Sequence, residues 1–324
     1  MRRAGVLMLT GGMLAATLVG CAAPYDGDGE MALVGSLSEG AAPDTDAMPI
    51  VVDTDLGGDD LVALAFLLRH PRVRVEAVSI AATGLVGCDP GVDLVADLFT
   101  ALEEDPVPVA CGRADAGPAA LPFPAEWREL AETGTGIPRS SDTWVAAAEP
   151  APELIADLAG HTRGLVVVAL GPMTNLADLA VSSPAGYSRL AGIHAMAGSV
   201  DGPAVDGVAD WNVAADPEAF AAVLAAAAPL TVVPEDAVPE GTPDALSAPV
   251  VGAVAATIDY PKWWDLATAA ALVTDGARVE TGRWVSDASE PGRLRRDGAG
   301  SVRVVRSLDG GQLDAEYTRV FAPE

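Results

Sequence analysis

Short segments that are apolar along almost their whole length alternate with helical patterns through most of this chain. The apolar segments read PIVVD, VRVEAVSIAA, VPVACG, GLVVVAL, LAGIHAMAG and PLTVVP, and stretches such as DLVALAFLLRH and DPEAFAAVLAAAA lie between them. Strands of this kind are buried on both faces, which is typical of a parallel sheet covered by helices. The sequence therefore predicts one α/β domain over residues 49–324, with a doubly wound, mostly parallel sheet flanked by helices. Two strand-like segments, ARVETGRWVSD and SVRVVRSLD, are expected to close the chain.

The N-terminal residues differ in composition from the predicted domain. MRR precedes the apolar run AGVLMLTGGMLAATLVG, which ends at Cys21. This pattern predicts a bacterial lipoprotein signal peptide over residues 1–21, with lipidation at Cys21 of the lipobox LVGC. The alternative is an ordinary signal peptide that happens to end at a cysteine. The apolar run is too short to indicate a permanent membrane span.

Residues 22–48 are rich in Gly, Ala and Asp and have no sustained period, so they predict a flexible tether. The mature protein is then expected outside the cytoplasm, anchored to the cell membrane through its lipid alone. The chain has 46 acidic and 19 basic residues, for a formal net charge of −27. Without a basic stripe, a nucleic-acid polymer is excluded as a partner. A small-molecule substrate is expected, and a homo-oligomer remains open.

Four aspartates lie close together in DTDLGGDD, directly after the first predicted strand: Asp53, Asp55, Asp59 and Asp60. Acidic residues are favoured at a helix N-terminus, which accounts for Asp59 or Asp60. It does not account for the other two carboxylates at a strand end. Ligands of doubly wound folds bind beyond the carboxyl ends of the strands, and several carboxylates there suit Ca²⁺ or, less readily, Mg²⁺. The motif therefore predicts a metal site.

Three later segments place polar residues at the starts of predicted helices. They contribute Thr174 in GPMTN, Asp210 and Asn212 in VADWNVAADPEAF, and Asp265 in YPKWWDLATAAALV. Each junction alone is typical of a helix cap, but together they predict a single site at one edge of the sheet. The loop-rich residues 112–142 are candidates to cover it.

These motifs, taken in order, resemble those of the inosine-uridine preferring nucleoside hydrolases. The matching positions are residues 53–60, 170–177, 211–212, 216–219 and 265. The resemblance spans about residues 49–273 and implies a divergent, lipoprotein-type member with a doubly wound fold. It further implies a Ca²⁺-dependent enzyme that hydrolyses ribonucleosides to ribose and free base.

The resemblance also implies roles for individual residues. Asp55, Asp60, Asp265 and the main-chain carbonyl of Thr174 would bind the Ca²⁺. Asp55 would also accept the proton of the attacking water. Asp59 would be the second catalytic residue beside Asp55, and Asp59 and Asn212 would hold the ribose hydroxyls.

The sequence departs from the family pattern mainly at expected substrate contacts. Trp264 stands where many members have a His that helps to protonate the leaving base. Trp263 or Trp264 would stack on a purine, or both would be core residues. Leu85 and Ala204 replace two usual asparagines, and Asp210 replaces a Glu, which weakens or changes the expected contact with the far end of the ribose.

Two other functions remain as alternatives to the hydrolase. A lipoprotein that binds a riboside or polyol with calcium, without turnover, would use the same metal site. A haloacid-dehalogenase-type phosphatase would use Asp53 and Asp55 as its nucleophile and acid. That mechanism needs a downstream lysine in a suitable motif, and the single lysine, Lys262, has no Gly-Asp-x-x-x-Asp after it.

Two cysteines and three histidines lie within the predicted domain. Cys88 and Cys111 each follow a predicted strand, and outside the cytoplasm a disulfide between them is permitted, although their distance is left open. His70 is expected to be exposed at a helix end, and His161 to lie in a loop. His194 is expected to be a hydrogen-bonded core residue.

Overall fold

The computed structural model describes residues 47–141, 144–226, 228–287 and 289–322. The predicted signal peptide, its Cys21 and the tether up to residue 46 lie outside these residues. Within the described residues, no helix is long and apolar enough to cross a membrane.

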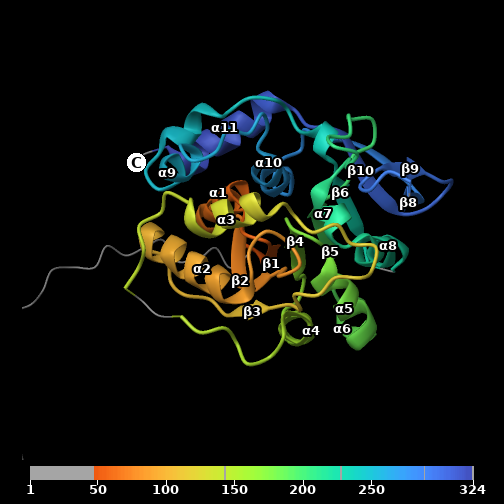
Figure 1. The fold of residues 1–324 in the computed structure, drawn as a ribbon, viewed down its shortest axis with the longest axis horizontal. Coiled ribbons are helices and arrows are strands. Elements are labelled where there is room, and N and C mark those ends of the chain that lie inside the picture. Colours follow the sequence, from red (N-terminus) through yellow and green to blue (C-terminus); the bar gives the residue numbers. More distant parts are fainter. Residues whose placement is uncertain (1–46, 142–143, 227, 288, 323–324) are drawn as a thin grey trace, which may run out of the picture. The chain divides into compact units, whose positions relative to one another are not determined.

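An eight-stranded sheet forms the centre of the domain, in the order β3-β2-β1-β4-β5-β6-β10-β7 (Figure 1). All neighbouring strands pair in parallel except β10 and β7, which pair antiparallel at one edge. The predicted doubly wound, mostly parallel sheet is therefore confirmed. The strands are β1 Met48–Thr54, β2 Val73–Ile80, β3 Val109–Cys111, β4 Val166–Ala169, β5 Gly192–Met196, β6 Leu230–Val233, β7 Arg278–Gly282 and β10 Val302–Ser307.

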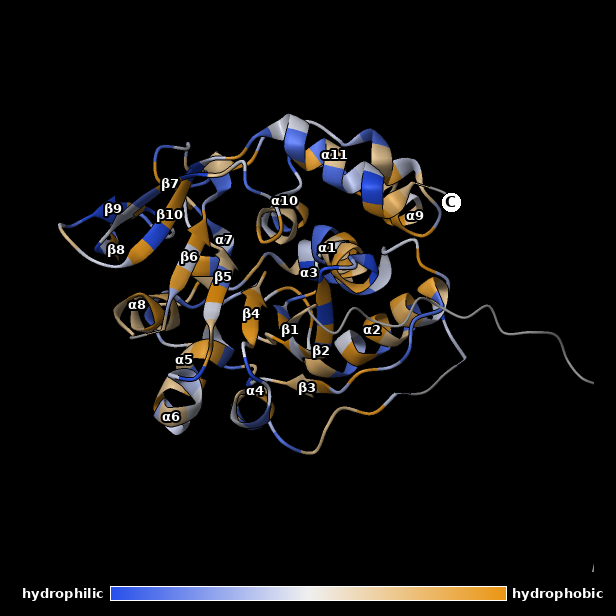
Figure 2. Ribbon diagram, turned by 180° about the vertical axis from the view of Figure 1, so that it is seen from behind, coloured by the Kyte–Doolittle hydropathy of each residue, from blue (hydrophilic) through white to orange (hydrophobic). Residues whose placement is uncertain are grey.

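Helices cover both faces of the sheet, and each face has its own apolar core. One core is formed with α1 Gly58–Arg69, α2 Cys88–Leu102, α9 Val251–Ala255, α10 Trp264–Ala271 and α11 Gly310–Phe321. The other is formed with α4 Ala151–His161, α5 Thr174–Ser182, α6 Pro184–Tyr187 and α8 Pro217–Ala225. Strands such as β4 and β6 are hydrophobic between these layers (Figure 2), as expected for a sheet buried on both faces.

Shorter elements connect the layers. They are α3 Ala125–Thr133, α7 Trp211–Ala215, the 3₁₀ turns η1 Glu235–Ala237 and η2 Asp244–Ser247, and a hairpin of β8 Trp284–Ser286 and β9 Leu294–Arg296. The two strand-like segments predicted near the end of the chain contain β7 and β10, which pair antiparallel, but they do not close the chain, because α11 follows β10. This helix buries Leu313, Tyr317 and Phe321, spaced by four residues along one face, against the core.

The histidines correct two local expectations. His70 is buried rather than exposed, because α11 covers it and brings Glu316 Oε1 to 2.6 Å from its Nε2. His161 ends helix α4 instead of lying in a loop. His194 is a core residue, as predicted: burial lowers its pKa to about 4, and its Nε2 donates to the carbonyl of Thr268 at 2.9 Å.

A disulfide joins Cys88 at the start of α2 to Cys111 at the end of β3, with the Cα atoms 5.6 Å apart. Replacing both cysteines with serine is expected to lower the free energy of unfolding by about 3 kcal/mol, since the bond closes a loop of 23 residues in the unfolded chain. Urea unfolding of the variant and of the wild type, oxidised and reduced, measures this. A variant as stable as the oxidised wild type would contradict the expectation.

Candidate metal and substrate site

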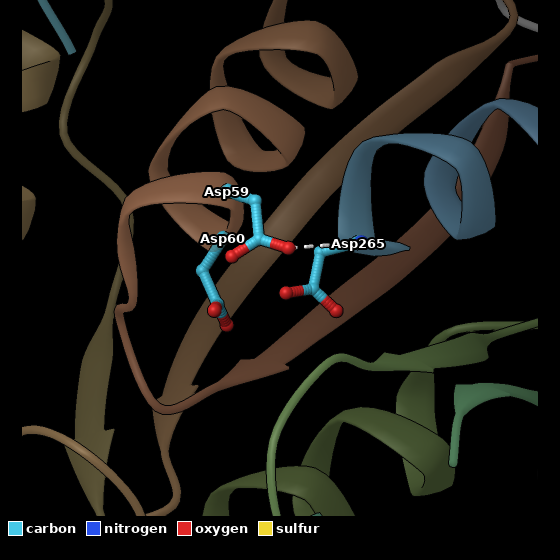
Figure 3. A group of neighbouring side chains, drawn as sticks. All are labelled: Asp59, Asp60 and Asp265. Carbon is cyan, nitrogen blue, oxygen red and sulfur yellow. Dashed lines mark hydrogen bonds between the residues drawn. The ribbon is translucent and has the colours of Figure 1, made fainter. Parts of the chain in front are cut away.

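Three carboxylates from two distant segments meet beyond the carboxyl end of β1. Asp59 and Asp60 lie in the first turn of α1, and Asp265 lies in the first turn of α10. All three are buried, and one oxygen of each lies within 4.8 Å of the others (Figure 3). The main-chain N–H of Asp265 also donates to Asp59 Oδ2 at 3.4 Å. The packing of α1 against α10 therefore brings Asp60 and Asp265, both predicted as metal ligands, together with Asp59, which was predicted as a ribose contact.

The electrostatics of this group fit a divalent cation. Burial raises the pKa of Asp59 to about 7, and the nearby charge of Asp60 adds to that rise. Burial, followed by the charges of Asp59 and Asp60, raises the pKa of Asp265 well above its usual range. Within the described part of the chain, Asp265 Oδ1 is buried without a hydrogen-bond donor. Clustered hard oxygen ligands that repel one another are the donor set of Ca²⁺ and Mg²⁺ sites.

Asp55 lies beside the three-carboxylate group, in the turn between β1 and α1. Its Oδ2 accepts a hydrogen bond from the main-chain N–H of Leu85 at 3.1 Å. Burial raises its pKa well above the usual range, and the charge of Asp60 contributes next. A Cβ atom on Gly84 would lie 2.2 Å from Asp55 Oδ2, so only glycine lets the loop after β2 approach this closely. Asp55 is thus fixed by a backbone hydrogen bond on one side and faces the like charge of Asp60 on the other.

Asp60 is oriented by the end of β1. Its Oδ1 accepts from Thr54 Oγ1 at 2.5 Å and from the main-chain N–H of Asp55 at 3.3 Å. Asp53 is separate from this group: its Oδ1 accepts from Ser79 Oγ at 2.6 Å and from Asn175 Nδ2 at 2.7 Å. Of the four aspartates in the motif, Asp53 therefore belongs to a buried polar network between β1, β2 and α5.

Thr174 begins α5 and is fully buried. Its Oγ1 donates to Asp216 Oδ2 at 2.9 Å and lies 2.8 Å from Thr83 Oγ1. Asp216 in turn caps α8, through its Oδ1, by accepting from the N–H of Ala219 at 3.1 Å. A Cβ on nearby Gly171 would lie 2.9 Å from Asp55 Cβ, so the start of α5 approaches the acidic group. Coordination by the Thr174 carbonyl remains a prediction.

Asp210 and Asn212 lie at the start of α7, beyond the ends of β4 and β5. Asp210 Oδ1 caps α7 by accepting from the N–H of Val213 at 2.8 Å, and burial raises its pKa to about 6. Asn212 Nδ2 donates to the carbonyls of Leu170 at 2.6 Å and Met196 at 3.3 Å. These bonds orient both side chains at the predicted sheet edge, while their contacts with ribose remain predictions.

The two tryptophans before Asp265 differ in environment. Trp263 is a core residue, 3 % exposed. Trp264 is partly buried, its ring lies 5.7 Å from that of Tyr260, and its Nε1 is buried with no acceptor among the residues described. Trp263 therefore follows the core alternative, and stacking by Trp264 on a base remains a prediction.

The segment predicted as a cover contacts α7, next to Asn212. The ring of Phe123 stacks on Trp211 at 5.5 Å, and Trp127 of α3 meets the same indole edge-on at 5.3 Å. Arg128, also on α3, reaches the loop after β2. These contacts were not predicted, although the sequence signal for them is an aromatic and basic group within a proline-rich loop.

Comparison with known proteins gives one family. A family model described as inosine-uridine preferring nucleoside hydrolase matches residues 50–312. The pyrimidine-specific ribonucleoside hydrolase of Salmonella schwarzengrund is 29 % identical over 194 residues, which cover 57 % of this chain and 60 % of that protein. The chain thus spans about 60 % of the length of the curated relatives that it matches.

Solved structures agree on the fold. The inosine-uridine preferring nucleoside hydrolase of Bacillus anthracis superposes with a TM-score of 0.72 at 23 % identity, over 84 % of this chain and 98 % of the other. The purine-preferring ribonucleoside hydrolase of Gardnerella vaginalis gives a TM-score of 0.73 at 20 % identity, over 84 % and 98 % of the two chains.

Proposed function

Since this chain belongs to the inosine-uridine preferring nucleoside hydrolase family, we propose that it hydrolyses the N-glycosidic bond of ribonucleosides with Ca²⁺ as cofactor. The observation that carries the proposal is the meeting of Asp59, Asp60 and Asp265 at the sheet edge, beside Asp55. Asp55, Asp60, Asp265 and the carbonyl of Thr174 would hold the ion. When bound, the ion supplies positive charge that neutralises these carboxylates, fixes sugar hydroxyls and activates water.

The chain's own residues support the chemistry of this reaction. Cleavage of an N-glycosidic bond builds positive charge on the ribose ring, as in other glycoside hydrolysis. Buried carboxylates stabilise that charge because they are already oriented before the reaction begins. Asp55, held by the N–H of Leu85, accepts the proton of the attacking water. Asp59 and Asn212 bind the ribose hydroxyls, and Asp210 lies toward the far end of the sugar.

The proposal is tested by reducing-sugar release from a panel of purine and pyrimidine ribonucleosides, with calcium and with chelator. Calcium-dependent release from any member of the panel supports the proposal and gives the base preference. Sugar release that is unaffected by chelator would show that the reaction does not require the ion.

The second candidate function is calcium-dependent binding of a riboside or polyol without turnover. Leu85 and Ala204, at positions where the family usually has asparagine, motivate it. A calcium-dependent rise in melting temperature, with no sugar released from any nucleoside, would favour this function. The phosphatase alternative is not favoured by the family, and Lys262 Nζ donates to the carbonyl of Glu235 at 3.2 Å.

Trp264 takes the role of a stacking surface for the base in this proposal. Replacing it with Ala is expected to raise KM for purine nucleosides roughly three- to tenfold, since an aromatic pair contributes about 0.5–1.5 kcal/mol beyond its buried area. Replacement with Phe should keep most of the affinity. Steady-state kinetics compare the two variants, and an unchanged KM in Trp264→Ala would assign the residue to packing alone.

We also propose that the mature protein is extracytoplasmic and anchored through a lipid on Cys21. The motivation is the lipobox LVGC after the apolar run. Incorporation of labelled palmitate in a bacterial host, lost in Cys21→Ala, is the expected result. Equal labelling of the variant would show that the cysteine is not the lipidation site.

A further inference from the structure

Helix α3 reaches both sides of the candidate site with two consecutive residues. Trp127 packs against Trp211 of α7, and Arg128 Nη1 donates to the carbonyl oxygen of Gly84 at 2.9 Å. No residue of α3 is itself buried, and Arg128 forms no ion pair within the described part of the chain. The hydrogen bond to Gly84 is therefore the specific polar contact made by this guanidinium.

The bond from Arg128 ends on the peptide group that also holds Asp55. The carbonyl of Gly84 and the N–H of Leu85 belong to one peptide unit, and that N–H donates to Asp55 Oδ2 at 3.1 Å. Because a peptide unit is planar, fixing the direction of its oxygen also fixes the direction of its N–H. A hydrogen bond from a guanidinium is stronger than a neutral one, and bonds in series polarise one another.

The backbone on both sides of this peptide is anchored by main-chain hydrogen bonds. The turn is closed on its N-terminal side by the Gly84 N–H, which donates to the carbonyl of Ala81 at 2.9 Å. On the C-terminal side, the N–H of Val86 donates to the main-chain carbonyl of Asp55 at 3.1 Å, and Arg128 adds its bond to the Gly84 carbonyl between these two anchors. No side chain larger than hydrogen fits at position 84, since a Cβ atom there would lie 2.2 Å from Asp55 Oδ2.

We propose that Arg128 is a positioning residue for Asp55, and that it acts from the covering helix through the single peptide group between Gly84 and Leu85. The inference rests on the proposed function for the role of Asp55 in catalysis and calcium binding. It adds that the position of α3 affects the orientation of Asp55. When α3 lies over the site, the bond from Arg128 holds the Asp55 side chain in one orientation through the Gly84–Leu85 peptide. In this proposal Arg128 acts only through its hydrogen bond to the carbonyl of Gly84.

The first test measures how well the Leu85 N–H is protected by its hydrogen bond, in the full chain without metal. Amide hydrogen exchange at Leu85, followed by NMR, is expected to be at least tenfold faster in Arg128→Met than in the wild type. Arg128→Lys should recover part of the protection, because its ammonium is able to donate one bond. The matched control is Arg139→Met, which removes an arginine of the same segment that pairs with Asp97 at 3.2 Å. Unchanged Leu85 exchange in Arg128→Met would overturn the proposal.

The second test measures how the loss of Arg128 changes the calcium affinity and the activity that depend on Asp55. Calorimetric titration with calcium is expected to show three- to tenfold weaker binding in Arg128→Met, and kinetics a roughly tenfold lower kcat with a smaller change in KM. A variant that raises KM alone would make α3 a cover without influence on Asp55, which would also overturn the proposal. If the wild type releases no sugar or binds no calcium, the proposed function fails, whereas Leu85 exchange still decides the role of Arg128.

Discussion

Replacing Asp60 with Asn is expected to weaken calcium binding by more than about 100-fold and to reduce nucleoside hydrolysis by a factor of the order of 10³. The amide has the shape of the carboxylate and still accepts from Thr54 Oγ1, but it lacks the negative charge. The remaining buried carboxylates, Asp55, Asp59 and Asp265, cannot supply that charge in its place. Calorimetric calcium titration and reducing-sugar release measure the two effects on the same preparation.

The matched control for Asp60→Asn is Asp157→Asn on the exposed surface of α4. Its carboxylate pairs only with the exposed His161, at 3.4 Å, and lies in no acidic group within the described chain. This variant should bind calcium and hydrolyse nucleosides like the wild type. If Asp60→Asn binds calcium as tightly as the wild type, Asp60 is not a ligand of the ion.

Without calcium, the protein is expected to become less stable as the pH rises from roughly 4 to 7. Burial raises the pKa of Asp59 from 3.8 to about 7, so between these values the folded state keeps a proton that the unfolded state has released. The stabilising effect of that proton is complete below the unfolded pKa and is lost as the pH passes the folded pKa. The pKa of Asp265 is raised in the same direction, which strengthens the trend.

Calcium is expected to reverse this loss, because a divalent ion binds the ionised carboxylates of the folded state alone. The gain in melting temperature on adding calcium should therefore grow over the same pH range. It should reach roughly 5 °C or more near neutral pH, since ~1 kcal/mol moves the Tm of a domain of this size by roughly 2–4 °C. Differential scanning fluorimetry with chelator and with calcium measures both curves. A calcium shift of equal size across the range would contradict the explanation, and in Asp60→Asn the shift should disappear.

Local patterns in the sequence were enough to predict the sheet and the edge that carries the site. Continuous apolar runs such as residues 164–170 indicate strands buried on both faces, and parallel strands present their carboxyl ends at the same edge. Asp59 and Asp265, far apart in the chain, were expected together because each lies at the start of a helix predicted at that edge. The fold and family are shown, while the roles of these residues in binding and catalysis stay predictions.

The sequence by itself indicated the alternation of strands and helices along the chain, the polar residues at their junctions and the family, because each depends on local periodicity or on short motifs. Only the tertiary structure decided that Cys88 meets Cys111, that α11 buries His70, and that Arg128 reaches the peptide beside Asp55. Each of these depends on the distance between segments that are separate in the chain. Such distances follow from how the helices pack on the sheet, and no local pattern contains them.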